Sequence, residues 1–243
     1  ASEAIGKGKV TFTGSNEAPN VFKAPAAGST AKGGAEADTL IGGAGNDVFT
    51  ATGGQDMMTG GLGDDTFILG ASNVYQDRAK PAVTTITDFG SGKDVLDFSR
   101  LLNKSVDISA LVAVMATRVP SAAGVTPVVL PIPATNGLVT LIENNGAWVE
   151  GAGADVVSRS ATEADVATLF GTGKLFSSPT QVTKSVVITA DTRNSADVWL
   201  ILNNTGVTAI TDGTSGPQEV IQIAHLEGSW NVTLVGTIPV LLS

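Results

Sequence analysis

Residues 33–68 consist of four consecutive blocks of nine residues: GGAEADTLI, GGAGNDVFT, ATGGQDMMT and GGLGDDTFI. The sixth position of every block is aspartate, and the eighth is a large apolar residue. The aspartates are Asp38, Asp47, Asp56 and Asp65, and the apolar residues are Leu40, Phe49, Met58 and Phe67. Because glycine loses more backbone entropy on folding than any other residue, a repeated glycine-rich phrase requires a geometric reason. Four contiguous copies that keep both positions are hard to produce by chance.

The blocks resemble G-G-x-G-x-D-x-U-x, the calcium-binding nonapeptide of RTX (repeats-in-toxin, hemolysin-type) proteins, in which U is apolar. The chain is thus similar to the C-terminal portion of a protein of this family. The resemblance implies a parallel β-roll in which each block forms a six-residue turn and a three-residue strand. Two blocks form one coil, and calcium lies between the turns of blocks n and n+2. Calcium takes about six to eight oxygen ligands, which aspartate and turn carbonyls supply.

The same resemblance predicts the calcium ligands. Blocks 42–50 and 60–68 share one side of the roll and keep the full consensus, so the best site is expected between Asp47 and Asp65. The turn carbonyls expected there are those of Gly42, Gly43, Ala44, Gly45, Gly60, Gly61, Leu62 and Gly63. A second, weaker site is expected from Asp38 and Asp56, because their blocks depart from the consensus. A solenoid that binds no metal is disfavoured, since it has no use for an aspartate at position six of every block.

Both flanks of the array carry related sequence. Residues 84–101, TTITDFGSGKDVLDFSRL, resemble the segment that follows the repeats in many RTX exoproteins. Two interpretations are open: Asp88, Asp94 and Asp97 contribute to a terminal calcium on the last coil, or they form turns and solvated strand ends. Upstream, block 15–23 places Asn20 at position six and Phe22 at position eight, as expected for a degenerate coil that caps the roll.

The expected fold class is all-β: a short parallel β-roll followed by a β-rich C-terminal domain with one or two short helices. The expected domains are a degenerate lead-in and cap at 1–32, the roll with its terminal cap at 33–98, and a C-terminal domain at 99–243. Within the last, a hairpin is expected at 138–150, with further strands at 185–190, 197–203, 219–226 and 230–236. One helix is expected after a Ser160 cap, with Glu163 as its capping-box partner.

Composition removes several function classes. The 243 residues include no cysteine, which excludes disulfides, thiol catalysis and thiolate metal sites. With His225 as the one histidine, a zinc cluster of several imidazoles is excluded and a serine–histidine–aspartate triad has little support. A formal net charge of −9 disfavours nucleic acid and anionic membranes as partners. No stretch is long and apolar enough for a membrane-spanning segment. We therefore predict that the chain is not an enzyme.

RTX proteins are typically exported unfolded by the type I secretion machinery of Gram-negative bacteria, through an uncleaved C-terminal signal, and fold outside the cell in calcium. The resemblance therefore implies a secreted protein, extracellular or on the cell surface, with such a signal within 99–243. The expected function is a non-enzymatic structural module that folds on Ca²⁺ binding, within an S-layer protein or adhesin. The alternative is the secretion-and-folding tail of an RTX exoenzyme of protease or lipase type. Expected partners besides calcium are the secretion machinery and either further copies of the chain or cell-surface glycans.

Overall fold

The computed structural model describes residues 2–3, 8–70, 82–102, 138–143, 149–150, 157–158, 162–167, 183–190, 195–203, 218–228 and 240–241. The chain divides into two compact units. The first comprises Ala1–Lys104 and Ile223–Ser243, and the second comprises Ser105–Gln222. Strand β16, Gln218–Glu227, crosses this division along the chain.

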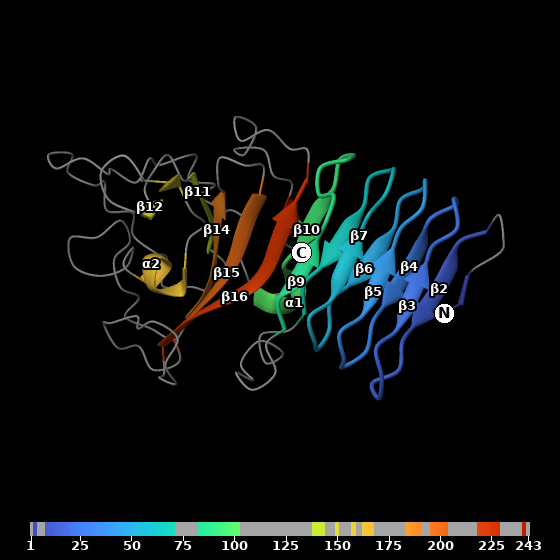
Figure 1. Cartoon of the computed structure of the whole chain (residues 1–243), viewed down its shortest axis with the longest axis horizontal. Coiled ribbons are helices and arrows are strands. Elements are labelled where there is room, and N and C mark those ends of the chain that lie inside the picture. The colour runs from blue at the N-terminus through green and yellow to red at the C-terminus, as the bar shows by residue number, and fades with distance from the viewer. Residues whose placement is uncertain are drawn as a thin grey trace, which may run out of the picture. The chain divides into compact units, whose positions relative to one another are not determined.

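The first unit is a parallel β-roll whose short strands alternate between two sheets (Figure 1). Besides the end of β16, its strands are β1 Ser2–Glu3, β2 Val10–Thr13, β3 Val21–Lys23, β4 Ser29–Lys32, β5 Thr39–Ile41, β6 Val48–Thr50, β7 Met57–Thr59, β8 Thr66–Ile68, β9 Thr84–Ile86, β10 Val95–Asp97 and β17 Val240–Leu241. One sheet runs β1-β3-β5-β7-β9 and then the end of β16, and the other runs β17-β10-β8-β6-β4-β2. Consecutive strands therefore lie in opposite sheets, and the all-β parallel roll expected from the sequence is confirmed.

The nonapeptide explains the three-residue strands. Its glycine-rich positions form the turn, and its last three positions form a strand whose middle side chain points inward. Register repeats every two blocks, so that Leu40 pairs with Met58 and Phe49 with Phe67. The inward residues make two apolar columns, each at most 1% exposed: Phe22, Leu40, Met58 and Ile86 in one, and Ala31, Phe49, Phe67 and Leu96 in the other.

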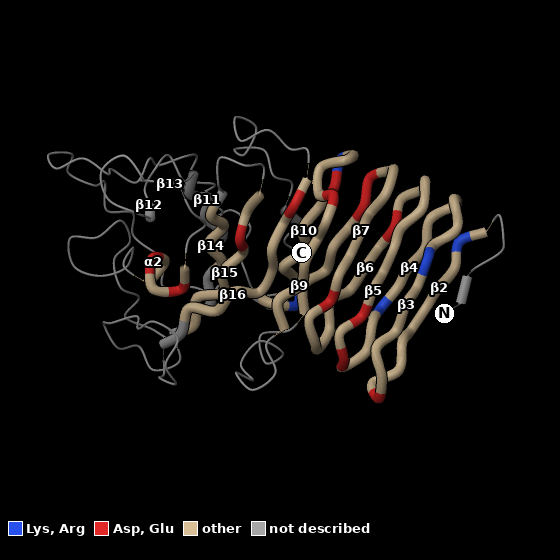
Figure 2. Tube along the Cα trace, in the orientation of Figure 1, with Lys and Arg blue, Asp and Glu red and all other residues tan. Residues whose placement is uncertain are grey.

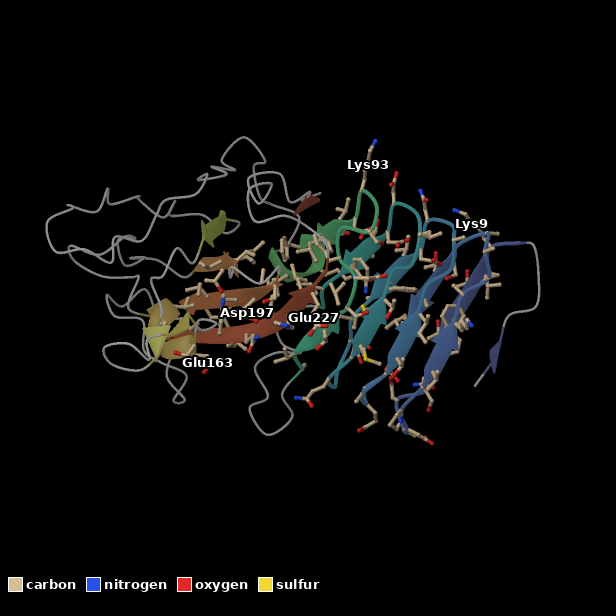
Figure 3. The ribbon with its side chains drawn as sticks, turned by 45° about the horizontal axis from the view of Figure 1, so that its top comes forward. Lys9, Lys93, Glu163, Asp197 and Glu227 are labelled. Carbon is tan, nitrogen blue, oxygen red and sulfur yellow. The ribbon has the colours of Figure 1, made fainter. Side chains whose placement is uncertain are left out.

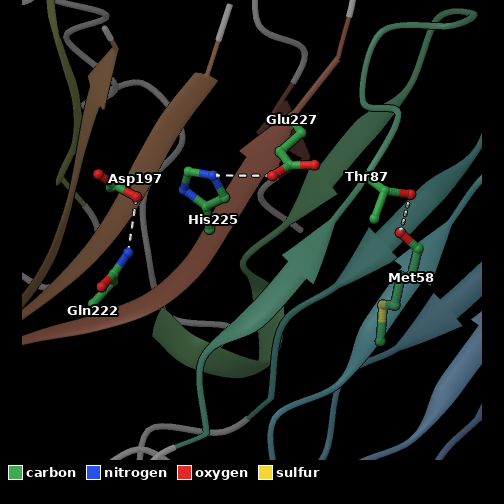
Figure 4. Close-up of polar contacts among 6 residues, drawn as sticks. All are labelled: Met58, Thr87, Asp197, Gln222, His225 and Glu227. Atoms are coloured by element: carbon green, nitrogen blue, oxygen red, sulfur yellow. Dashed lines mark hydrogen bonds and ion pairs between the residues drawn. The ribbon is translucent and has the colours of Figure 1, made fainter. Parts of the chain in front are cut away.

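The roll continues for a further coil beyond the four blocks. Met58 pairs in parallel with Ile86, and Phe67 pairs with Leu96. Thr59 Oγ1 and Thr87 Oγ1 lie 2.7 Å apart, and the Thr87 hydroxyl also donates to the Met58 carbonyl at 3.4 Å (Figure 4). The segment 84–97 is thus stacked on the array. The extra residues that shift its register lie between β8 and β9, apart from one between β9 and β10.

The last coil is extended by strands from the end of the chain. Leu226 of β16 pairs with Ile86 of β9, and Val240 of β17 pairs with Leu96 of β10, both in parallel. These residues fall within the C-terminal domain expected at 99–243, yet residues 223–243 cluster with the roll. A short helix, α1 Ser99–Leu102, follows β10 directly.

The second unit contains β11 Leu138–Glu143, β12 Val149–Glu150, β13 Val157–Ser158, α2 Glu163–Ala167, β14 Thr183–Ala190 and β15 Ser195–Asn203. β14 lies between β15, which is antiparallel to it, and β11, which is parallel. Consecutive residues 196–202 of β15 are all buried, so this strand is covered on both faces. Its Trp199 Nε1 donates to Thr189 Oγ1 at 2.8 Å.

One local prediction for the second unit was wrong. The hairpin expected at 138–150 does not form, because β11 pairs with β14 and β12 pairs antiparallel with β13. Helix α2 is capped by Thr162: Asp165 N donates to Thr162 Oγ1 at 3.2 Å, and Thr162 N donates to Asp165 Oδ2 at 2.8 Å. Ser160 and the strand expected at 230–236 lie outside the described residues. Within the described part of the chain, neither helix is long and apolar enough to cross a membrane.

Candidate metal centre

The position-six aspartates form two columns along the turns of the roll. Asp47, Asp65 and Asp94 belong to one column, and Asp38 and Asp56 to the other, each at most 1% exposed. In each column, Oδ1 accepts the backbone N–H of the preceding member. Asp47 N donates to Asp65 Oδ1 at 2.7 Å, Asp65 N to Asp94 Oδ1 at 3.0 Å, and Asp38 N to Asp56 Oδ1 at 3.0 Å. Figure 2 shows how acidic residues accumulate in the later coils, whereas several lysines lie on the first ones.

The second carboxylate oxygen normally binds within its own block. It accepts the backbone N–H four residues earlier, from Gly34 to Asp38, from Gly43 to Asp47 at 2.9 Å, from Thr52 to Asp56 at 3.1 Å and from Gly90 to Asp94 at 2.7 Å.

Asp65 breaks this rule. The corresponding donor, Gly61 N, donates to Asp88 Oδ2 at 2.7 Å, and Gly60 N donates to Asp88 Oδ1 at 2.7 Å. Asp65 Oδ2 is therefore buried with no hydrogen-bond partner. A buried carboxylate oxygen without a partner is costly unless a ligand satisfies it.

Electrostatics at these aspartates favours protons or a cation. Burial raises the pKa of Asp65 to about 7, and the neighbouring charges of Asp94, Asp47 and Asp88 add to the rise. Burial likewise raises the pKa of Asp56 to about 6, although backbone N–H groups of Thr52 and Asp38 oppose it. The pKa of Asp94 is also raised, by burial and then by the charge of Asp88. A divalent cation would remove this repulsion.

The glycine turns bring the backbone of adjacent coils into direct contact. A Cβ at Gly42 would overlap the Gly60 carbonyl, and a Cβ at Gly60 would overlap Asp65 Oδ2 and lie 3.1 Å from the Phe67 ring. Gly61 has φ of +92°, which side-chain-bearing residues rarely adopt. The turns therefore stack closely enough for carbonyls of one coil to face the next.

The predicted ligands do not all gather in one place. Asp94 is buried and continues the Asp47–Asp65 column, while Asp88 lies in the adjoining turn. Asp97 lies apart, on β10 opposite Ile68, where its Oδ1 accepts Ser99 N at 2.7 Å at the start of α1. Asp94 was expected near the last coil as one of two interpretations, but not as the sixth position of a further block, although residues 89–97, FGSGKDVLD, keep Gly90, Gly92, Asp94 and Leu96 at consensus positions. Calcium binding there stays a prediction.

The donor chemistry fits calcium, provided that the backbone takes part. Among the described residues, no three acidic or histidine side chains come together as a metal-binding group. Three pairs of stacked turns offer carboxylates from two successive coils of a column, those of Asp38 with Asp56, Asp47 with Asp65 and Asp65 with Asp94. The remaining ligands of an ion held there would have to be turn carbonyls. Carboxylate and carbonyl oxygens are the hard donors that Ca²⁺ prefers, and the unpartnered Asp65 Oδ2 is one oxygen free to serve.

Comparison with known families agrees with this chemistry. Residues 32–67 match the model of the RTX calcium-binding nonapeptide repeat, in four copies. No curated protein matches the chain significantly. No solved structure does so either. The four blocks are therefore RTX repeats, and their ligand is calcium.

Proposed function

We propose that the aspartate columns hold calcium between stacked turns, so that the roll is a calcium-dependent folding element of a secreted structural protein. The observation that carries the proposal is the buried Asp65 carboxylate, whose Oδ2 has no hydrogen-bond partner while its Oδ1 is held by Asp47 N. In a chain that folds without metal, this arrangement opposes folding. In a chain that folds with Ca²⁺, it supplies a preformed ligand.

Three turn pairs carry aspartate on both sides. The principal site joins Asp47 and Asp65 with the carbonyls of turns 42–45 and 60–63. A second joins Asp38 and Asp56 on the opposite side of the roll. A third joins Asp65 and Asp94, with Asp88 fixing the turn at Gly60 and Gly61.

Coupling between binding and folding follows from these contacts. Bound Ca²⁺ supplies two positive charges and about six to eight coordination positions for oxygen. The unfolded chain cannot assemble carbonyls from two turns, so ligand binding favours the folded state. At about 100 times the dissociation constant, one site stabilises the fold by about 2.7 kcal/mol. Without calcium, the carboxylates remain buried beside one another.

The wider role that we propose is non-enzymatic. The chain is exported unfolded through type I secretion and folds in extracellular calcium, as part of a surface protein of the S-layer or adhesin type in a Gram-negative bacterium. Its low content of charged residues, 15%, supports a structural role. So does the combination of metal ligands with a roll that buries its aspartates rather than exposing them to a substrate.

A calcium titration of the purified chain, followed by far-UV circular dichroism, tests the proposal. Wild type should gain β signal and melting temperature as calcium is added, and the double variant Asp47→Asn/Asp65→Asn should respond weakly. Asp64→Asn is the matched control, because Asp64 is exposed in the same turn and should leave the response unchanged. If wild type has the same stability in chelator and in calcium, the proposal is wrong.

A further inference from the structure

The coil of β3 and β4, which precedes the four blocks, carries no aspartate at position six. Asn20 stands there in one column, directly before Asp38, because Val21 of β3 pairs with Thr39 of β5. Ser29 stands there in the other column, directly before Asp47. Both columns of acidic side chains therefore begin with a neutral residue at the N-terminal end of the roll.

The Asn20 amide nitrogen is surrounded by oxygen atoms from two turns. Nδ2 lies 2.9 Å from the Ser15 carbonyl oxygen, 3.1 Å from the Ala18 carbonyl oxygen and 2.8 Å from Asp38 Oδ1. The first two oxygens belong to its own turn, and the third belongs to the next coil. Asn20 Oδ1 accepts Ser15 N at 3.1 Å, which fixes the orientation of the amide. A group carrying partial positive charge thus lies among carbonyl and carboxylate oxygens, the donor set expected around calcium in later turns.

The local backbone is adapted to this amide. Val10 pairs with Ser29, 19 positions later, whereas Val21 pairs with Thr39, 18 positions later. The turn between β2 and β3 is therefore one residue longer than the turn between β4 and β5, which stacks on it. A Cβ at Gly14 would lie 2.6 Å from Asn20 Nδ2, and a Cβ at Gly34 would collide with the Ser15 carbonyl. The longer turn and the two glycines allow the Ser15 and Ala18 carbonyl oxygens to approach the amide from its own turn, while Asp38 approaches it from the next coil.

Ser29 occupies the corresponding position in the other column of the same coil. It is 2% exposed, and its hydroxyl donates to Asp47 Oδ1 at 2.6 Å. Asp47 therefore has a neutral donor on the N-terminal side and Asp65 on the other. Where the coil of β3 and β4 meets the next coil, neither pair of stacked turns places two carboxylates together.

We infer that the Asn20 carboxamide takes the place of a calcium ion in the first turn pair, so that the N-terminal end of the roll is closed without metal. The inference rests on the proposed calcium sites between later turns. It implies that calcium occupies fewer turn pairs than the coils provide. It also implies that a single substitution at Asn20 would create a calcium site in this turn pair. Asn20→Asp would put a second carboxylate next to that of Asp38, beside the Ser15 and Ala18 carbonyls.

The first test is calcium stoichiometry, measured by isothermal titration calorimetry and by metal analysis after desalting. Asn20→Asp should bind one more calcium ion per chain than wild type. Asn16→Asp is the matched control, because it adds the same charge to an exposed position of the same turn and should bind no additional ion. A folded Asn20→Asp variant with wild-type stoichiometry overturns the inference, and so does an additional ion in Asn16→Asp.

A second variant decides the question independently. Asn20→Ala removes the amide without adding a ligand, and should lower the melting temperature by similar amounts in chelator and in calcium while leaving the stoichiometry unchanged. A loss confined to calcium would show that this turn pair depends on metal, which contradicts the inference. If wild type binds no calcium at all, the proposed function fails, and the Asn20→Ala loss still reports whether the amide closes this end.

Discussion

Replacing Asp65 with asparagine should change the stability of the chain in opposite directions with and without calcium. The substitution keeps the size of the side chain and keeps the Oδ1 that accepts Asp47 N, but removes the buried charge. Asn20 shows that an amide is accommodated at position six of this roll. The variant therefore separates the electrostatic role of Asp65 from its packing.

The magnitude follows from the pKa of Asp65. Above about pH 7 the carboxyl is ionised in both states, yet its folded pKa is about 7 against roughly 4 for an unfolded aspartate. This difference corresponds to at most about 4 kcal/mol of destabilisation. Burying the amide nitrogen that replaces Oδ2 costs about 2 kcal/mol, which leaves a net gain of about 2 kcal/mol for the asparagine variant. In chelator, Asp65→Asn should thus raise the melting temperature by about 4–8 °C.

With calcium, the sign reverses. Asp65 belongs to two of the three proposed sites, and an amide is a weaker calcium ligand than a carboxylate. Loss of one site saturated about 100-fold removes about 2.7 kcal/mol, and weakening of the second adds to it. The same variant should therefore melt below wild type in saturating calcium. The assay is thermal melting by circular dichroism in both conditions at about pH 8, with sucrose in all samples if the metal-free chain is unfolded.

Asp64→Asn provides the matched control. Asp64 is exposed, its Oδ1 accepts Lys93 N at 3.0 Å, and an asparagine oxygen can accept the same bond. Lys93 itself projects outward from the turn between β9 and β10 (Figure 3). This control should stay within about 0.5 kcal/mol of wild type in both conditions. The reasoning is refuted if Asp65→Asn destabilises the chain in chelator, or if Asp64→Asn stabilises it equally, since net charge would then suffice.

Further predictions concern pH, the turns and the end of the roll. In chelator, the folded chain binds more protons than the unfolded chain between about pH 4 and pH 7, because the pKa values of Asp65 and Asp56 are raised to about 7 and about 6. The stability of the folded chain should therefore fall as pH rises through that window. Denaturant midpoints measured at several pH values will test this. In calcium, protons compete with the ion, and the slope over the same window should be reversed. Gly60→Ala should destabilise the calcium-bound chain by at least about 2 kcal/mol, since its Cβ would overlap Asp65 Oδ2, whereas Gly8→Ala, with nothing within 4 Å of the added Cβ, should cost less than about 0.5 kcal/mol by thermal melting. Ending the chain after Gly228 removes β17 and exposes the edge of β10, so melting temperature in calcium should fall and light scattering should reveal association; an unchanged chain would mean that this strand pair contributes nothing.

The repeat predicted the roll well because its two constraints are local and periodic. Aspartate at position six and an apolar residue at position eight determine which side chains face the turns and which face the core, and strand register follows from the 18-residue coil. The buried columns of Phe49 with Phe67 and of Leu40 with Met58 could therefore be predicted from spacing alone.

Departures arose where register or pairing depends on distant residues. Asp94 keeps the consensus surroundings but lies 29 positions after Asp65, so a fixed period does not connect them. The unpartnered Asp65 Oδ2 depends on Asp88 accepting from Gly61 N, a competition between segments that no single block encodes. β11 likewise pairs with β14 rather than with its neighbour in sequence, because strand propensity does not determine the partner.

Four repeats build only two coils, so the ends of the roll decide whether the array is stable. In a stack where each coil contacts only its neighbours, every uncovered end removes one interface and exposes apolar side chains. Here a degenerate coil stacks below Leu40 and Phe49, and a coil at 84–97 stacks above Met58 and Phe67. Outside these, β16 and β17 extend the far end, and β1 and β2 extend the near end. Within the degenerate coil, Asn20 and Ser29 hydrogen-bond to the first aspartate of each column. The calcium sites that we propose are thus confined to interior turn pairs. Each ion there would link two coils that are already packed, and this placement would let a short array respond to calcium as one unit.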